Sequence, residues 1–392
     1  MRIIVTGLIG NYTLGGVAWD YLQYLLGFEA LGHEVWYLED TGGWVYNPIA
    51  GEPTIDCSYN VNYLGSLLAE FDLGDRWIFR NEPDGKTYGV ENPETADRII
   101  AEADVLVNVS GACWLRESTS KPAHRLFLDG DPMFTQVAML NPARPEVLEH
   151  ARMHTDHFTF ALNINDADCQ IPTLGLQWKP TIQPVATDRW VGPEAGIDPA
   201  HPAQGAYTTA MNWVSYKPVE FNGESYGQKD QEFLRFLDLP RLSPAKFLLA
   251  MGRGAGQKRP TEQILAAGWN IIEPAEIIAD YRGYRSFLAN SRGEWSVAKH
   301  GYVQSRSGWF SCRSACYLAA GVPVVVQDTG WSRHLPTGDG VFAFETMEQS
   351  AAAIASIESN PAHHQAAARA FARDHLDAPK VCQALLDQSG IE

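Results

Sequence analysis

Residues 295–334 decide the fold, and they read WSVAKHGYVQSRSGWFSCRSACYLAAGVPVVVQDTGWSRH. The succession of apolar, polar and glycine-bearing segments predicts four elements: a strand at Trp295–Ala298, a loop at Lys299–Phe310, a helix at Ser311–Ala320 and a strand at Val322–Val326. Ser311 is suited to cap the helix, and Gly321 followed by Pro323 ends it. The last strand is apolar at all five positions, which is typical of a parallel sheet covered on both faces.

Cations and hydroxyl groups gather before and at the start of the predicted helix. A strand–loop–helix unit directs the free N–H groups of the first helical turn towards a ligand above the strand ends. The same stretch supplies Lys299, Arg306, Arg313, Ser305, Ser307 and Ser311. These groups predict an anion site that a diphosphate would fit. The alternative is a capped helix with exposed basic residues, which the clustering on one loop disfavours.

This stretch resembles the donor-binding segment of GT-B fold glycosyltransferases, in which a glycine-rich loop and helix bind a nucleotide diphosphate. The matching residues are Gly308, Gly321, Val322, Pro323 and Val324. Two departures stand out. Cys316 replaces the family's ribose-binding Glu, and Arg306-Ser307 replaces the His-Cys of the plant-type motif. The resemblance implies that Lys299, Arg306, Ser307, Gly308, Ser311 and Arg313 contact the nucleotide diphosphate, and that His300, Asp328 and Thr329 contact the sugar.

Composition narrows the class of protein. A chain of 392 residues predicts two domains, and 45% hydrophobic with 20% charged residues predicts a soluble, globular protein. The net charge of −17 opposes general nucleic-acid binding but allows a local basic pocket. The six cysteines have no metal-binding spacing, which predicts reduced thiols in a cytoplasmic protein. We expect neither a signal peptide nor a membrane span, since the apolar runs are too short.

The N-terminus predicts a strand at Arg2–Thr6, a glycine-rich loop at Gly7–Gly16, a helix at Val17–Ala30 and a strand at Glu34–Leu38. The loop has two interpretations. Glu39 and Asp40 after the second strand are compatible with a dinucleotide site. The strict G-x-G-x-x-G spacing and a Tyr-x-x-x-Lys motif are both missing from the sequence. We therefore favour a loop that faces a cleft, with Gly10, Gly15 and Gly16 as its contacting positions.

The remainder of the first half predicts long loops over residues 42–95 with one helix near Val61–Glu70, followed by alternating helices and strands. One of these strands, Arg125–Leu128, ends in Asp129-Gly130-Asp131. We expect the catalytic base among Asp131, Asp20 and Asp129, with Asp131 favoured because Pro132 follows it; capping of a turn is the alternative for Asp131. The Asp-x-Asp spacing resembles a GT-A metal motif, but the two-domain pattern predicts no metal.

The second half starts afresh with a strand at Ala206–Val214, and a helix predicted at Ile277–Asn290 leads into residues 295–334. A further strand, Phe247–Met251, leads into the loop Gly252–Pro260, where Arg253 and Lys258 form a second candidate diphosphate site; an exposed turn is the alternative. We predict an N-terminal acceptor domain at 1–178, a linker at 179–205 and a C-terminal donor domain at 206–375. A terminal helix at 376–392 is expected to return to the first domain.

Taken together, these patterns predict an α/β protein with two Rossmann-like doubly wound domains facing a cleft. The resemblance implies a metal-independent hexosyl- or pentosyltransferase that needs no cofactor. It would move sugar from a nucleotide-diphosphate sugar, such as a UDP-sugar, to a small-molecule or glycan acceptor. The acidic charge disfavours DNA as acceptor but leaves it open. The alternatives are an NAD-dependent nucleotide-sugar epimerase or dehydrogenase and a non-catalytic nucleotide-sugar-binding protein. The sugar, the base, the stereochemistry and the oligomeric state stay open.

Overall fold

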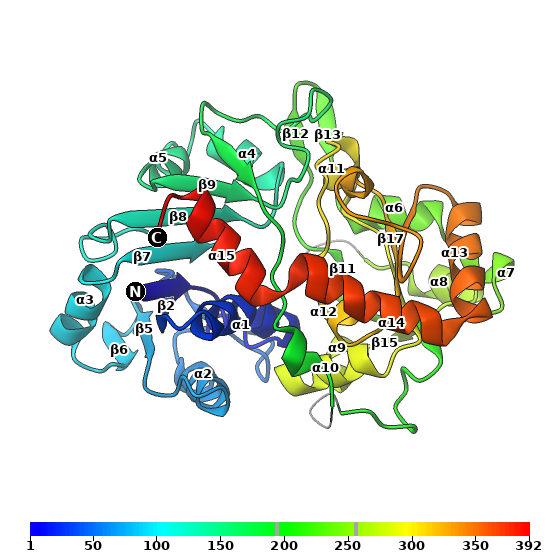
Figure 1. Ribbon diagram of the computed structural model, residues 1–392, viewed down its shortest axis with the longest axis horizontal. Helices are drawn as coiled ribbons and strands as arrows, with labels where there is room; N and C mark the ends of the chain where they lie inside the picture. The colour runs from blue at the N-terminus through cyan, green and yellow to red at the C-terminus, as the bar shows by residue number, and fades with distance from the viewer. Residues whose placement is uncertain (193–195, 255–257) are drawn as a thin grey trace.

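Two largely parallel sheets form the framework (Figure 1). The computed structural model describes residues 1–192, 196–254 and 258–392, with Arg253 and Gly254 as backbone only. The first sheet has the strand order β10-β9-β8-β7-β1-β2-β5-β6. Its strands are β1 (Arg2–Thr6), β2 (Glu34–Glu39), β5 (Trp77–Asn81), β6 (Lys86–Gly89), β7 (Val105–Val109), β8 (His124–Asp129), β9 (Asp156–Thr159) and β10 (Trp178–Pro180). All pairings are parallel except that of β5 with β6.

The second sheet has the order β15-β14-β11-β16-β17-β18, and all its pairings are parallel. Its strands are β11 (Ala206–Val214), β14 (Lys246–Gly254), β15 (Asn270–Ile272), β16 (Gly293–Ser296), β17 (Val324–Gln327) and β18 (Val341–Phe344). In each sheet the strand order reverses once, between β1 and β7 and between β11 and β16. Such a switch point opens a crevice at the carboxyl ends of the strands, where ligands bind.

Helices cover both sheets, as the alternating pattern predicted. In the first half they are α1 (Gly15–Ala30), α2 (Ser58–Glu70), α3 (Pro93–Ala101), α4 (Phe134–Met139), α5 (Glu146–Arg152) and the short η1 (Thr187–Trp190). In the second half they are α6 (Lys229–Arg235), α7 (Leu239–Leu242), α8 (Thr261–Ala266), α9 (Pro274–Ile277), α10 (Tyr281–Ala289), α11 (His300–Gln304), α12 (Cys312–Ala319), η3 (Trp331–Arg333), α13 (Met347–Ser359), α14 (Pro361–Phe371), the π-helical η4 (Ala372–Leu376) and α15 (Ala378–Gln388). The predicted fold class of two Rossmann-like domains is confirmed.

The C-terminal helices join the two halves. Figure 1 shows α14 and α15 following one another across the molecule, from the second sheet to the first. Gly27 of α1 lies directly against Cys382 of α15, where a β-carbon would come within 2.6 Å of the sulfur. The Nζ of Lys179 donates to the carbonyl oxygen of Gln388 at 2.7 Å. The domain boundaries given above stay a prediction.

Three predicted elements were wrong in detail. Residues 42–95 hold the hairpin β3 (Val45–Asn47) and β4 (Glu52–Thr54) as well as β5 and β6, whose short length hides their periodicity. The predicted loop Lys299–Phe310 contains α11, whose five residues include Gly301. The helix predicted from Ile277 begins at Tyr281, because Asp280 accepts a hydrogen bond from the N–H of Gly283 at 2.8 Å and caps it. A second hairpin, β12 (Val219–Phe221) and β13 (Glu224–Tyr226), follows β11.

Among the described residues, we find no helix with both the length and the apolar character that crossing a bilayer requires.

Candidate active site

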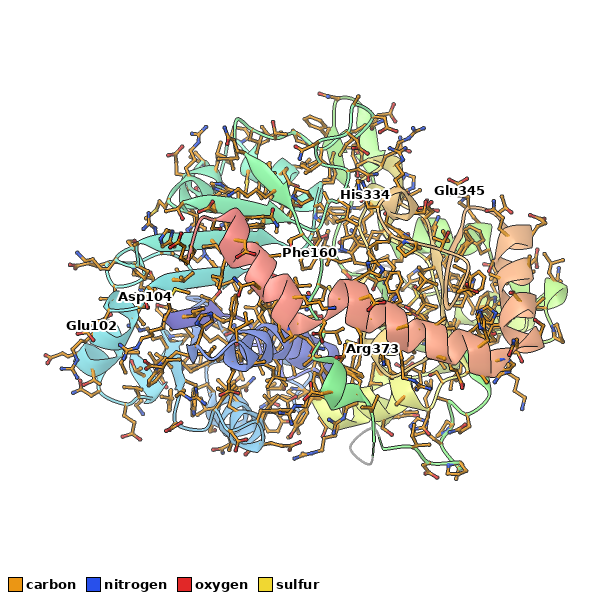
Figure 2. The ribbon with its side chains drawn as sticks, viewed as in Figure 1. Glu102, Asp104, Phe160, His334, Glu345 and Arg373 are labelled. Atoms are coloured by element: carbon orange, nitrogen blue, oxygen red, sulfur yellow. The ribbon has the colours of Figure 1, made fainter. Side chains whose placement is uncertain are left out.

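The cleft lies where the carboxyl ends of the two sheets meet. Side chains from opposite sheets are in direct contact there. Asn163 follows β9, and its Oδ1 lies 2.8 Å from Nε2 of His334. Oδ1 accepts a hydrogen bond when that nitrogen carries the proton. Figure 2 labels His334 above the centre of the molecule and Phe160 at the centre. The pairs His334–Asn163 and Lys299–Asp131 each join residues about 170 positions apart. Side-chain pairs of this kind hold the two halves of the chain together across the cleft.

Lys299 and Asp131 form the central pair across this cleft. The Nζ of Lys299 lies 2.9 and 3.1 Å from the two carboxylate oxygens of Asp131 and 2.6 Å from the hydroxyl of Tyr216. The hydroxyls of Tyr216 and Tyr302 also donate to Asp131. The rings of Phe134, Tyr216 and Tyr302 surround the ammonium group at 4.6–5.2 Å. Burial and the charge of Asp131 raise the pKa of both tyrosines. Lys299 is thus held by one carboxylate and three aromatic rings.

We expect Asp131→Asn to lower the midpoint of thermal unfolding by several degrees, about 2–8 °C, because Lys299 loses its counter-ion. Lys299→Met should have a similar effect. The double variant should lose less than the sum of the two, since the interaction is broken only once. Differential scanning calorimetry of the three variants measures this. Loss of turnover in Asp131→Asn with unchanged stability would instead identify Asp131 as the base.

Arg313 and Glu294 form a buried pair beneath the same crevice. The Nε of Arg313 lies 2.8 Å from Oε1 of Glu294, and its Nη1 donates to the carbonyl oxygen of Ala210 at 2.7 Å. The side chain of Glu294 is fully buried, and its Oε2 lacks a partner among the described residues. Arg313 was predicted to contact the diphosphate; the structure places it at this position, and its Nη2 has no hydrogen-bond acceptor among the described residues.

Lys229, the first residue of α6, completes a group of cations that we call the cation cluster: Lys229, Lys299 and Arg313. Burial, together with the charges of Arg313 and Lys299, holds the pKa of Lys229 well below its ordinary value, whereas Glu294 raises it. Among the described residues, Lys229 has no hydrogen-bonding partner that would explain its position. Lys229 was not predicted as a site residue, because its helix shows no unusual spacing. The signal present in the sequence was Gly227-Gln-Lys229 at the start of a helix.

The amino-terminal end of α12 points into the crevice beside this cluster. Ser311 precedes the helix with an extended backbone, and its side chain makes no capping hydrogen bond. The N–H groups of the first turn therefore have no side-chain acceptor at the cap, and they carry the positive end of the helix dipole. Together with three cations, they form a site of the kind that binds an anion.

The loop before α12 is held by contacts to both halves of the chain. The backbone N–H of Gly308 donates to the carbonyl oxygen of Thr329 at 2.9 Å, and a β-carbon at Gly308 would overlap Asn163. Ser307 Oγ donates to the carbonyl oxygen of Tyr302 at 3.1 Å. Gly308 also has a φ of +74°, so both its conformation and the close approach require glycine.

His300 and the outer sugar-site candidates occupy different places. His300 Nδ1 lies 2.8 Å from the buried carboxylate of Glu232. Burial opposes ionisation of Glu232, but hydrogen bonds from His300 and Gln327 hold its pKa below the ordinary value. His300 is therefore anchored to α6, the helix that begins with Lys229.

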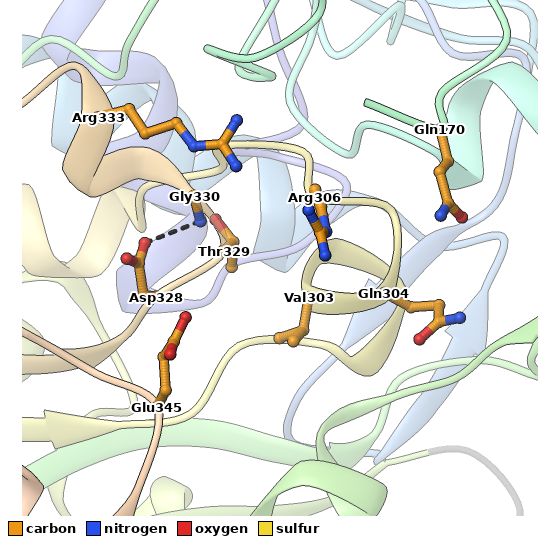
Figure 3. Close-up of a pocket in the computed structure, with 9 residues that line it drawn as sticks. All are labelled: Gln170, Val303, Gln304, Arg306, Asp328, Thr329, Gly330, Arg333 and Glu345. Carbon is orange, nitrogen blue, oxygen red and sulfur yellow. Dashed lines mark hydrogen bonds between the residues drawn. The ribbon is translucent and has the colours of Figure 1, made fainter. Parts of the chain in front are cut away.

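A polar pocket of about 470 Å³ lies at the ends of β17 and β18 (Figure 3). Three predicted site residues line it: Arg306, Asp328 and Thr329. Its remaining lining includes Gln170, Val303, Gln304, Gly330, Arg333 and Glu345. Asp328 Oδ1 accepts the N–H of Gly330 at 2.8 Å, as the dashed line in Figure 3 shows. Arg306 and Arg333 both pair with Asp168, at 2.9 and 2.7 Å, and close the outer rim between the domains.

The other two candidate carboxylates differ in environment. Asp129 is buried, and it accepts from the N–H of Asp131 at 2.9 Å, Gln136 at 2.7 Å and Thr159 at 2.8 Å, which is a turn-stabilising role. Burial raises the pKa of Asp20 from 3.8 to about 7, and the charge of Arg313 opposes this rise. Asp20 therefore faces the cation cluster from α1 with a pKa near neutrality.

The three glycines predicted as cleft contacts, Gly10, Gly15 and Gly16, each pack against a different neighbour. A β-carbon at Gly10 would come within 2.9 Å of Phe79, and one at Gly16 within 3.3 Å of Tyr284. A β-carbon at Gly15 would overlap the carbonyl oxygen of Asp280, which belongs to the second domain. Gly15 thus permits the start of α1 to touch the start of α10.

We expect Gly15→Ala to separate the two domains at this contact and to lower stability by about 1–3 kcal/mol, because backbone at Asp280 must move. The apparent KM for donor should rise, since the cleft is held open. Gly32→Ala is the control: a β-carbon there would meet no atom within 4 Å, and the positive φ of +83° strains alanine, so this variant should lower stability without raising the KM for donor. Equal KM values for Gly15→Ala and wild type would contradict the interpretation.

The acidic residues after β2 are committed to the protein itself. The carboxylate of Glu39 accepts from the N–H groups of Gly10, at 2.8 Å, and Asn11, and from the hydroxyl of Tyr37 at 2.7 Å. Burial raises the pKa of Glu39 to about 7, although these hydrogen bonds lower it. Asp40 pairs with Arg80 at 3.2 Å and Arg116 at 2.9 Å. Neither carboxylate is placed to accept from a ribose, which disfavours the dinucleotide interpretation.

The second candidate loop is described only in part. Lys258 is exposed, and the side chain of Arg253 lies outside the described residues. The neighbouring Arg259 pairs with Glu273 at 2.8 Å. One set of side chains in the described part of the chain could hold a metal ion: Asp339, His363 and His364, which lie at the opposite end of the second sheet from the cleft. The prediction that transfer needs no metal stays a prediction.

Comparison with known proteins shows the fold. No protein-family model matches the chain, and no curated protein matches its sequence. The solved structures that are similar in fold include the following three. AviGT4, a glycosyltransferase involved in avilamycin A biosynthesis, has a TM-score of 0.54 at 13% identity, over 100% of this chain and 97% of that chain. An alpha-glucosyltransferase in complex with UDP and a 13-mer DNA has a TM-score of 0.55 at 11% identity, over 100% and 99%. HepE from Anabaena in complex with UDP-glucose has a TM-score of 0.57 at 10% identity, over 100% and 99%.

The chain therefore has the GT-B fold of glycosyltransferases, as the resemblance of residues 295–334 implied. At these identities the likeness extends to the architecture and not to individual residues.

Proposed function

We propose that this protein is a glycosyltransferase that moves a sugar from a nucleotide-diphosphate sugar, such as a UDP-sugar, to an acceptor in the cleft. The observation that carries the proposal is the cation cluster at the amino-terminal end of α12. A partly buried lysine with a depressed pKa is unfavourable in the free protein, and a bound diphosphate would compensate its charge. Two solved structures of the same fold contain UDP or UDP-glucose, which supports this choice of ligand.

The chemical task is to stabilise the departing diphosphate. Lys229, Lys299 and the dipole of α12 place fixed positive charge where negative charge develops, which is the most effective form of transition-state stabilisation. The chain thereby supplies the charge that a metal ion supplies in other transferases. The transferred sugar would enter the polar pocket, where Asp328 and Glu345 offer acceptors for its hydroxyls.

We propose Asp20 as the base that takes the proton of the acceptor hydroxyl. Its pKa of about 7 matches the requirement for a base that works near neutral pH. Asp131, the favoured residue of the sequence analysis, already accepts from Lys299, Tyr216 and Tyr302. Proton abstraction by Asp131 would require breaking one of these contacts, and this favours Asp20.

The experiment is a transfer assay with radiolabelled UDP-, TDP-, GDP- and ADP-sugars, in which water or added sugars and phenols serve as acceptors. Release of nucleotide diphosphate above the rate of a Lys229→Ala control is the expected result. Binding without release would indicate the non-catalytic alternative. Release of NAD from denatured protein would indicate the epimerase or dehydrogenase. The net charge of −17 disfavours DNA as acceptor, because polyanion binding requires a basic surface.

A further inference from the structure

The hairpin of β3 and β4 carries apolar side chains on its solvent face. Its register pairs Val45 with Thr54 and Tyr46 with Pro53, and one step outward it places Trp44 opposite Ile55. Residues opposite one another in an antiparallel pair share a face. Val45 on the other face is fully buried, whereas Trp44 is 58% and Ile55 51% exposed. A solvent face of a hairpin is ordinarily polar, so this face is exceptional.

Tyr12 extends this face to the loop after β1. The rings of Tyr12 and Tyr46 are stacked at 6.4 Å with 27° between their planes. The N–H of Tyr46 donates to the carbonyl oxygen of Asn11 at 2.8 Å, and Asn60 joins Gly10 to Tyr46 through its amide at 2.7 and 2.9 Å. We call Tyr12, Trp44, Tyr46, Pro53 and Ile55 the aromatic platform. It is thus fixed to the loop that begins α1, the helix of Asp20.

The apolar surface also continues towards the boundary between the domains. Tyr59, in the first turn of α2, is 36% exposed. It lines a pocket of about 290 Å³ that α2 and α10 form together, with Tyr63 and Tyr281 also in the wall.

The charges near the platform indicate which partner fits. The sequence contains neither lysine nor arginine between Arg2 and Arg76, whereas Glu52 and Asp56 flank the platform. The segments that form the platform therefore carry no positive charge of their own to attract an anionic bilayer or a nucleic acid. Tyrosine and tryptophan rings present flat apolar area that stacks on other flat groups.

We propose that the aromatic platform binds the acceptor, and that this acceptor carries a flat, uncharged aromatic or alicyclic ring system. This inference rests on the proposed function, since it names the class of acceptor for the same cleft. The loop after β1 that carries Tyr12 leads directly into α1, so a ring stacked on the platform would lie beside the element that precedes Asp20. The platform thereby selects ring-bearing aglycones over free monosaccharides.

The test uses equilibrium dialysis of the whole protein with 2-naphthol, without donor. Wild type should bind 2-naphthol, and the variant with Trp44→Ser and Ile55→Ser should bind at least about 10-fold more weakly. The matched control is Leu242→Ser, which removes an equally exposed apolar side chain, 51%, from α7 of the second domain. This control should bind like wild type. Both altered platform residues are exposed, so the fold should persist.

Absence of 2-naphthol binding, or equal binding by wild type and the double variant, would overturn the proposal. It would also be overturned by gel filtration that shows a wild-type dimer and a monomeric variant, which would assign the platform to self-association. Sedimentation of wild type, but not the variant, with phosphatidylcholine vesicles would assign it to a bilayer. A separate titration with UDP distinguishes the two proposals: a protein that binds 2-naphthol but fails to bind UDP would refute the transferase while leaving the platform intact.

Discussion

Replacement of Lys229 by alanine should reduce turnover about 100- to 1000-fold, the effect of removing one donor that stabilises developing negative charge. The affinity for UDP should fall by about 1.5–3 kcal/mol, as expected for a lost hydrogen bond to a charged group. The physical reason is the position of Lys229 in the cation cluster, where burial and two neighbouring cations hold its pKa well below the ordinary value. Lys217→Ala, at an exposed lysine shortly after β11, is the control and should behave like wild type.

A proton count tests the same residue independently of the rate. In the free protein, the depressed pKa makes Lys229 lose its proton at a lower pH than an ordinary lysine does, and a bound diphosphate favours the charged form. UDP binding should therefore take up between zero and one proton. Calorimetric titration in buffers of different ionisation enthalpy measures this uptake. Lys229→Ala should abolish it, and undiminished uptake in the variant would show that another group is responsible.

Asp20→Asn should lower kcat/KM at least about 100-fold and change its dependence on pH. A base must be ionised to act, so the wild-type rate should rise with pH and level off above about 7, the pKa of Asp20. The variant cannot ionise, so its residual rate should lack this rise. A pH profile of kcat/KM between pH 5.5 and 8.5 provides the measurement. A wild-type rate in Asp20→Asn would eliminate Asp20 and direct attention to Asp131 or to a mechanism without a base.

Protein stability gives a second measure of Asp20. The pKa of Asp20 rises from its ordinary value of 3.8, which applies to the unfolded chain, to about 7 in the folded protein, so the folded state prefers the protonated form. The corresponding stabilisation is complete below the ordinary pKa and is lost as pH rises through about 7. The free energy of unfolding of wild type should therefore fall between pH 5 and 8, and less so in Asp20→Asn. Glu39, whose pKa is also about 7, should retain its part of the decline.

Long apolar strands and glycine-terminated helices were predictable from the sequence. The predicted bounds of β1 and β11 agree with the structure, since each is a continuous run that burial favours in a parallel sheet. The short strands of residues 42–95 were not predictable, because three- to five-residue elements show too few alternations. The helix predicted from Ile277 begins only at Tyr281, and the capping contact of Asp280 that sets this start is visible only in the structure.

The candidate site was predictable in part. The resemblance predicted Arg306 as a diphosphate contact and Asp328 and Thr329 as sugar contacts, and the structure brings all three into one pocket. Lys229 and the pairing of Lys299 with Asp131 were not predicted. Lys299 and Asp131 are 168 positions apart in the sequence. Contacts across the cleft depend on how two separate sheets approach each other, and local patterns in one sequence carry no information about that approach.

The most direct test of the central claim is a calorimetric comparison of UDP, UMP and NAD binding to the purified protein. A cation cluster that recognises the diphosphate predicts that UDP binds at least about 10-fold more tightly than UMP, since the terminal phosphate contributes about 1.4 kcal/mol or more. NAD should not bind measurably. Equal affinities for UDP and UMP, or binding of NAD in preference to UDP, would contradict the account.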